Sequence, residues 1–384
     1  MIKSSLDCFQ CSACACSCPK DAICFEPDQS SYLYPVVSEQ KCINCGICAS
    51  VCPLERNPTS MNRGLEKKAF IYSEPCSETS SSSSGGFCYE FSKYILNNGG
   101  LVYSAVFDEK TYSVQTKKIE DAHELDKARG SKYVKSFLGD TFISIKKNLE
   151  NRRVVLFVGM PCEIAGLLCY LKKSYANLIT LCLFCGGTIS QEIFKTHLEH
   201  IERFCGAKID NINFRKKTNK LLQYKTSVTL NNNGREIVLP EKFNLYMRIL
   251  SSNFIRPSCK VCKLNQTDFM ADLTIGDYHG NKTKKHSSLV FSNSSNCLVD
   301  KFLRSQEMVL TSLSIDEALN SARFRGGEAK QISQDEYHKF VVTFKQNGLK
   351  VAFKKFIYKN YTLKQKVSYY TPRFIKKIIH GKKK

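Results

Sequence analysis

The sequence predicts a small cysteine-rich α+β domain, then an α/β body with a mixed, partly parallel sheet, and finally a basic helical tail. Three observations favour this order: cysteines recur at fixed spacing near the N-terminus, strand and helix patterns alternate from about residue 100, and lysines accumulate after residue 336. A chain of 384 residues also exceeds a typical single domain of about 150 residues. The expected parts are an N-terminal domain at 1–58, a linker at 59–76, a body in two stretches at 77–150 and 151–325, and a tail at 326–384.

The composition is that of a globular protein. Hydrophobic residues make up 42% and charged residues 24%, which excludes a wholly disordered chain. The strongest apolar run, 154–158, is far shorter than the ~18 residues that cross a membrane. No apolar leader precedes the first cysteine, so we expect a cytoplasmic protein whose 20 cysteines stay reduced. Metal binding therefore explains these cysteines better than disulfides do.

Eight cysteines near the N-terminus form two copies of one spacing. The copies are Cys8-x2-Cys11-x2-Cys14-x3-Cys18-Pro19 and Cys42-x2-Cys45-x2-Cys48-x3-Cys52-Pro53. In bacterial two-cluster ferredoxins, three thiolates of such a run bind one [4Fe–4S] cluster and the fourth binds the other. We therefore predict a ferredoxin-like dicluster domain. Cluster one would be held by Cys8, Cys11, Cys14 and Cys52, and cluster two by Cys42, Cys45, Cys48 and Cys18. The alternative is a pair of zinc sites, which also use CxxC pairs but need neither the fourth Cys-Pro nor the duplication.

The body is expected to alternate strands and helices. Short β-branched and apolar runs predict strands at 101–107, 153–158, 178–184, 209–215, 227–230 and 273–275. Apolar residues at helical spacing predict helices at 87–97, 141–148 and 163–171, and a further one that begins at Ser190. Ligands of such sheets gather at the C-terminal ends of the strands.

Four further cysteines and a serine-rich segment are candidate functional residues. Cys162 and Cys185 follow predicted strands, and Cys259 and Cys262 form a CxxC pair, so these four could hold a third metal centre. Alternatively, Cys162 and Cys185 pack as small hydrophobic residues, and Cys259 and Cys262 bind structural zinc. The segment 77–86 reads either as a flexible linker or as a phosphate-binding loop at the start of the following helix.

Several short motifs, in order, are similar to those of one family. They are Ser84-Gly85-Gly86, Arg129-Gly130-Ser131-Lys132-Tyr133, Pro161-Cys162-Glu163, Cys185-Gly186-Gly187, Phe214-Arg215-Lys216-Lys217, Cys259-x2-Cys262 and Gly276-Asp277-x2-Gly280. With them the chain resembles the coenzyme F420 hydrogenase/dehydrogenase beta-subunit family, in its form with a fused N-terminal ferredoxin domain. The resemblance extends to about residue 320.

The resemblance implies a flavoprotein with FAD in the α/β body and a third [4Fe–4S] cluster beside it. The implied flavin contacts are Ser84, Gly85, Gly86, Ser131, Lys132, Tyr133, Gly276 and Asp277. The implied ligands of the third cluster are Cys162, Cys185, Cys259 and Cys262. The residues agree with a pyrophosphate site, because a Ser-Gly-Gly loop with Arg129 and Lys132 offers amides and cations.

Three departures from the family pattern bear on the substrate. Gly186 stands where the family usually has histidine, Glu163 where it has glutamine, and Tyr278-His279 where it has Phe-Trp. They argue against coenzyme F420 itself as the substrate. We expect an oxidoreductase that relays electrons between its clusters and FAD, with hydride transfer to or from an unidentified organic substrate; no catalytic residue is identified. The alternatives are an electron-transfer subunit of a separate enzyme, with polysaccharide biosynthesis as one setting, and a zinc-stabilised binding protein.

The tail accounts for much of the net charge of +22. From Tyr337 onward it has 14 lysines and arginines, no acidic residue, and aromatic side chains interleaved with the charge. This pattern is typical of a helix that contacts the inner face of a membrane, and of a surface that docks an acidic redox partner such as ferredoxin or flavodoxin. Packing of the apolar side chains on the body is the structural alternative. Nucleic acid is the least favoured ligand, because no reading motif accompanies the charge.

Overall fold

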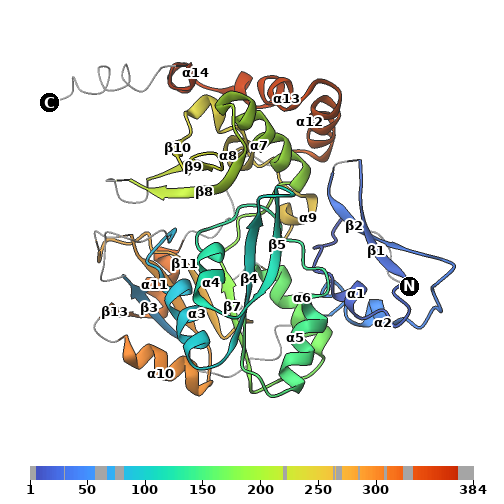
Figure 1. Cartoon of the computed structure of the whole chain (residues 1–384), viewed down its shortest axis with the longest axis vertical. Coiled ribbons are helices and arrows are strands. Elements are labelled where there is room, and N and C mark those ends of the chain that lie inside the picture. Colours follow the sequence, from blue (N-terminus) through green and yellow to red (C-terminus); the bar gives the residue numbers. More distant parts are fainter. Residues whose placement is uncertain are drawn as a thin grey trace.

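The N-terminal segment consists of two short helices and a hairpin. The computed structural model of the chain describes residues 6–29, 31–56, 67–73, 82–218, 223–262, 264, 270–283, 286–306, 309–322 and 332–370 (Figure 1). The hairpin pairs β1 (Ile23–Pro27) with β2 (Leu33–Val37), and the helices are α1 (Ala13–Cys16) and α2 (Ile47–Ser50). Each helix follows a left-handed residue in a cysteine motif, Ser12 at φ 62° and Gly46 at φ 74°. The repeat in sequence is therefore also a repeat in local structure.

The body is built on an eight-stranded mixed sheet, which confirms the predicted class. Its order is β13-β3-β12-β11-β7-β6-β4-β5. The strands, in that order, are Leu310–Leu313, Lys68–Tyr72, Ser288–Ser292, Leu273–Asp277, Leu178–Leu183, Val155–Gly159, Leu101–Asp108 and Ser113–Ile119. The four neighbours β11, β7, β6 and β4 run parallel, and the outer strands are antiparallel. Every residue of β6 is buried, as expected for a central strand covered on both faces.

Helices cover both faces of this sheet. On one face lie α3 (Phe87–Asn97), α4 (Ala122–Ala128) and α10 (Cys297–Ser305), where Phe87, Phe91 and Phe302 pack together. On the other face lie α5 (Thr141–Glu150), α6 (Pro161–Leu171) and, further along, α11 (Ile315–Ser321). The N-terminal segment packs beside α5 and α6 through Ala13 and Val51 (Figure 1). Its cysteines are thus held against the body.

Further helices surround a second sheet, which is antiparallel and three-stranded. This sheet contains β8 (Ile209–Lys217), β9 (Tyr224–Leu230) and β10 (Glu236–Val238). Around it lie α7 (Gln191–Cys205), α8 (Leu245–Ser251), α12 (Gln334–Asn347), α13 (Leu349–Phe356) and α14 (Leu363–Tyr370) (Figure 1). One apolar core joins these helices to the hairpin residues Tyr32 and Tyr34.

The tail therefore packs on the body over the part that the structure describes. The buried tail side chains include Tyr337, Phe340, Phe344, Phe353 and Phe356. Most aromatic side chains of α12 and α13, which a membrane-surface helix would insert, are used in this core. Residues 371–384, which carry the last lysines, lie outside the described residues. Among the residues described, no helix is both long enough and apolar enough to cross a bilayer.

The predicted elements are present, and several further strands were not predicted. β3 lies within the region expected to be a linker, 59–76, and forms part of the sheet by pairing with β12 and β13. Two other parts of that linker, 59–66 and 74–76, and the first half of the serine-rich segment, 77–81, lie outside the described residues. β5, β10, β12 and β13 were also missed. β10 and β13 are short edge strands, which carry little periodicity, and β12 is a buried five-residue strand between β3 and β11.

Candidate metal centres and cofactor site

The four cysteines predicted for cluster one lie together. Burial, with the neighbouring thiols of Cys8 and Cys52, raises the pKa of Cys14 to about 12. Burial also raises the pKa of Cys11, and the thiols of Cys14 and Cys8 act in the same direction. Metal binding would therefore have to displace protons from these thiols. The amide of Gln10 donates to the Sγ of Cys8 at 3.3 Å, a contact of the kind that tunes iron–sulfur clusters.

The four cysteines predicted for cluster two line one cavity. Its walls include Cys18 from the first copy of the motif and three residues from the second, namely Cys42, Cys45 and Cys48. The amide of Ala22 donates to the Sγ of Cys18 at 3.3 Å. Cys45 is exposed, so this cavity lies at the surface of the N-terminal segment. The exchange of the fourth cysteine between the two copies agrees with the predicted ligand sets.

The third set comes from three separate segments of the body. Cys162 stands in the first turn of α6, Cys185 follows β7, and Cys259 and Cys262 belong to α9 (Pro257–Lys260) and the residues after it. Burial raises the pKa of Cys162 to about 12, and Cys259 and Cys262 act in the same direction. Burial is the main cause of the raised pKa of Cys185, and the thiols of Cys259 and Cys162 raise this pKa further. The four thiols are therefore electrostatic neighbours.

Each set has the donor chemistry of an iron–sulfur cluster. Within the described ranges, no three Cys, His, Asp or Glu side chains are close enough together to hold one metal ion. A four-iron cubane is wider than a single ion, so its thiolates need not meet at one point. Each set supplies four thiols, and in the third set the amide of Gly187 donates to the Sγ of Cys185 at 3.4 Å. The residues present fit the cluster.

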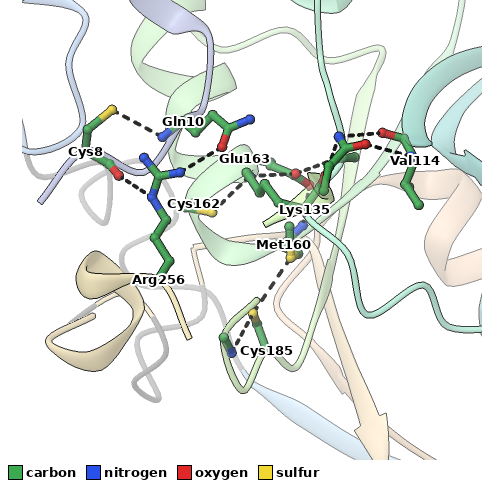
Figure 2. A network of polar contacts seen from close by, with 12 residues as sticks. Cys8, Gln10, Val114, Lys135, Met160, Cys162, Glu163, Cys185 and Arg256 are labelled. Carbon is green, nitrogen blue, oxygen red and sulfur yellow. Dashed lines mark hydrogen bonds and ion pairs between the residues drawn. The ribbon is translucent and has the colours of Figure 1, made fainter. Parts of the chain in front are cut away.

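A buried ion pair touches the third set (Figure 2). The Nζ of Lys135 lies 2.7 Å from the Oε1 of Glu163 and 3.4 Å from the Sγ of Cys162. Ser136 donates to the same carboxylate oxygen at 2.7 Å, and the amide of Met160 donates to the other at 2.9 Å, which caps α6. Burial alone would lower the pKa of Lys135, but Cys162 and Glu163 raise it overall.

A second buried cation joins the N-terminal segment to the third set. Arg256 is 1% exposed and precedes Pro257 at the start of α9. It donates to the carbonyl of Cys8 at 3.0 Å, to Oε1 of Gln10 at 2.8 Å and to the carbonyl of Leu33 at 3.0 Å (Figure 2). Its guanidinium also lies 4.4 Å from the ring centre of Tyr34. Sequence reasoning missed this role, because the partners lie more than 220 positions away.

The N-terminal segment approaches α6 without room for a side chain at Gly166. A Cβ there would lie 2.7 Å from the Cβ and 2.8 Å from the Sγ of Cys11. The Cys162 thiol also contributes to the raised pKa of Cys11, after burial and the nearer thiols. Cluster one and the third set are therefore neighbours across this contact.

The serine-rich loop lies beside the second segment expected to bind flavin. The amide of Ser131 donates to Oγ of Ser83 at 2.6 Å, and Nε of Arg129 donates to Oγ of Ser82 at 3.3 Å. Gly86, at φ 91°, leads into α3.

The same loop packs closely against the sheet at Gly85. This residue has a packing reason to be glycine, since a Cβ would overlap the backbone of β3 and of Ser288. Its amide donates to Ser288 at 3.1 Å, and Ser84 donates to the carbonyl of Ser287 at 2.7 Å.

Tyr133 and Asp277 meet at the boundary between the two sheets. The guanidinium of Arg215 lies 2.6 Å from Oδ2 of Asp277 and 3.9 Å from the ring centre of Tyr224. Burial raises the pKa of Tyr133. The charge of Arg215 lowers this pKa and the charge of Asp277 raises it, but burial has the largest effect. Arg215 was noted only as part of a family motif, and its position between the two expected flavin segments was not predicted.

Two residues that were expected to contact flavin, Lys132 and Gly276, make close contacts within the protein. The Nζ of Lys132 donates to the carbonyls of Arg129 at 2.9 Å and Lys127 at 3.2 Å, at the C-terminal end of α4. Burial lowers the pKa of Lys132 to about 7. Gly276 is needed for packing, because a Cβ would overlap the ring of Phe184.

Two family models match parts of the chain. Residues 152–315 match the model of a family described as coenzyme F420 hydrogenase/dehydrogenase, at the C terminus of its beta subunit. Residues 35–55 match that of the 4Fe-4S binding domain. No curated protein matches the chain significantly. A chain of the xenon-derivatised F420-reducing [NiFe] hydrogenase complex from Methanosarcina barkeri is similar at 17% identity and a TM-score of 0.45, over 76% of this chain and 91% of that one. The two family models confirm the resemblance over the residues that they match, 152–315 for the C terminus of the beta subunit and 35–55 for the 4Fe-4S binding domain.

Proposed function

We propose that the chain is an oxidoreductase subunit that transfers electrons between three [4Fe–4S] clusters and FAD bound in its α/β body. The observation that carries this proposal is the succession of the three cysteine sets. Cys48 of the second set is an electrostatic neighbour of Cys14 in the first, and Cys162 of the third set is a neighbour of Cys11. Electrons would pass from cluster two through cluster one to the third cluster, or in reverse.

The proposed FAD site uses the serine-rich loop and the boundary between the sheets. When bound, FAD would couple the one-electron clusters to transfer of a hydride. Ser83, Ser131 and Arg129 supply polar groups for a pyrophosphate, while Lys132 is held by the end of α4. Tyr133 and Asp277, joined through Arg215, are proposed to line the other part of the site.

The exposed edge of cluster two is the proposed contact for a redox partner. Cys45 is exposed there, so an electron carrier or a neighbouring subunit can approach this cluster closely. The family model that matches residues 152–315 is described as a beta subunit, and this description motivates a search for a partner subunit. The lysines of α12 and α13 are proposed to attract an acidic partner, because Phe340, Phe344, Phe353 and Phe356 beside them are buried in the apolar core.

Metal and flavin content test the proposal. Protein purified without oxygen should contain about twelve irons, matching sulfide and one FAD per chain. The double variant Cys259→Ser and Cys262→Ser should lose about a third of the iron. Cys297→Ser is the matched control, because that cysteine is exposed at the start of α10, and its iron content should not change. Zinc without iron would refute the proposal. About eight irons without flavin would instead support an electron-transfer subunit of a separate enzyme.

A further inference from the structure

The Lys135–Glu163 ion pair lies beside the third set of cysteines, and a contribution to stability alone does not explain this position. Both side chains are almost fully buried, with 5% and 4% exposed. Breaking such a pair is costly, yet an apolar pair of similar volume often stabilises a protein equally well. The backbone of Lys135 is also fixed, since Val134 pairs with Ile189 and the carbonyl of Lys135 accepts from Gln191 at 3.0 Å. The ammonium is therefore held in one place beside the third set of thiols.

The ammonium interacts with ligands of two proposed clusters. Cys162 and Glu163 are consecutive residues in the first turn of α6, so one Nζ reaches both, at 3.4 Å and 2.7 Å. Cys11, from the set of cluster one, also interacts electrostatically with Lys135. Lys135 opposes the rise in the pKa of Cys185 that burial and neighbouring thiols cause. The contact to the Cys162 thiol is a direct hydrogen bond.

A cation in this position favours the reduced state of a cluster. Reduction adds a negative charge to the cluster, and a charged N–H donor to a ligand sulfur stabilises that charge in a low-dielectric site. The carboxylate of Glu163 offsets part of the effect, because it lies closer to the ammonium than the sulfur does. The two side chains should therefore act on the potential in opposite directions.

We propose that Lys135 raises the reduction potential of the third cluster and that Glu163 limits this rise. The inference rests on the proposed third cluster. A rise in its potential favours electron transfer from the N-terminal segment into the body. Lys135 and Glu163 are positioning residues in this proposal, since they act through the Cys162 thiolate.

Redox titration followed by electron paramagnetic resonance tests the proposal. The signal of the third cluster is identified by its loss in the Cys259→Ser and Cys262→Ser variant. Lys135→Gln should make reduction of this cluster at least tenfold less favourable, which is a shift of about 59 mV downward for a one-electron couple. Glu163→Gln should shift the potential upward. Lys135→Arg keeps a charged donor and should remain near the wild-type potential.

The outcomes separate this inference from the proposed function. About twelve irons with unshifted potentials in both glutamine variants would overturn the inference and leave the three-cluster proposal standing. Shifts of the same sign in both variants would also overturn it. About eight irons in the wild-type protein would overturn both. If Lys135→Gln does not fold, Glu163→Gln alone decides, because an upward shift is expected and an absent or downward shift contradicts the proposal.

Discussion

Two lysines three positions apart show how differently a protein interior can treat the same side chain. Lys132 places its ammonium on the last carbonyls of α4, and burial lowers its pKa to about 7. Lys135 is more deeply buried, yet Cys162 and Glu163 raise its pKa above the usual value. Both side chains lose hydration, but only Lys135 has a carboxylate in contact. The partner rather than the burial decides whether the charge is kept.

The largest expected effect comes from removing the partnered cation. Lys135→Met should lower the free energy of unfolding by about 3–5 kcal/mol, because it leaves the carboxylate of Glu163 buried without a counter-charge. The double variant Lys135→Met and Glu163→Gln should recover most of this loss. Urea unfolding of oxygen-free protein, followed by circular dichroism, measures both. Lys132→Met is the matched control and should cost less than Lys135→Met. Equal losses in the two single variants would refute the comparison.

A smaller effect is expected where the N-terminal segment meets α6. Gly166→Ala should destabilise the protein by about 1–3 kcal/mol, because the new methyl group would overlap Cys11. Alanine normally stabilises a helix interior relative to glycine by about 1 kcal/mol, so the sign of the change is itself informative. Urea unfolding measures it. A gain in stability would show that Cys11 does not lie against α6, and thus not within reach of the charge on Lys135.

The smallest effect for each single pH unit is a slope of stability with pH that Lys132 should produce and Lys135 should not. The pKa of Lys132 falls from 10.5 in the unfolded chain to about 7 in the folded protein, so between these values the unfolded state binds more protons. Its contribution is fully present above pH 10.5 and is lost as the pH falls towards 7. Stability should therefore rise by about 1 kcal/mol for each pH unit in that range, relative to Lys132→Met. The raised pKa of Lys135 gives a contribution that is kept below pH 10.5, so Lys135→Met should leave the slope unchanged. Parallel curves for the wild type and Lys132→Met would contradict this account.

Local features of the sequence predicted more than distant ones did. The cysteine spacing predicted that Cys18 and Cys52 exchange between the two motifs, and the structure places both with those partners. The parallel central strands β4, β6, β7 and β11 were predicted from their apolar runs, whereas β3 was not, because its neighbours lie more than 200 positions away. The Lys135–Glu163 pair gave no signal either, since an isolated lysine is usually a surface residue.

The tail illustrates a second limit. Aromatic residues between lysines fit a membrane surface, a docking surface and an apolar contact equally well, and the sequence did not choose among them. The choice depends on whether the body offers an apolar partner. Here α7, α8 and the hairpin offer one, through residues such as Phe254, Tyr246 and Tyr32.

The shared core has a consequence for how the chain is made. The ring of Tyr32 stacks on Tyr337 at 5.9 Å between ring centres, and the hairpin carbonyl of Leu33 accepts from Arg256. A ribosome releases the N-terminal segment first, so these contacts cannot form until most of the chain has been synthesised. The eight cysteines of that segment therefore emerge long before the side chains that cover the hairpin. During this delay the contacts of Tyr32 with Tyr337 and of Leu33 with Arg256 are absent, so the hairpin beside these cysteines is uncovered.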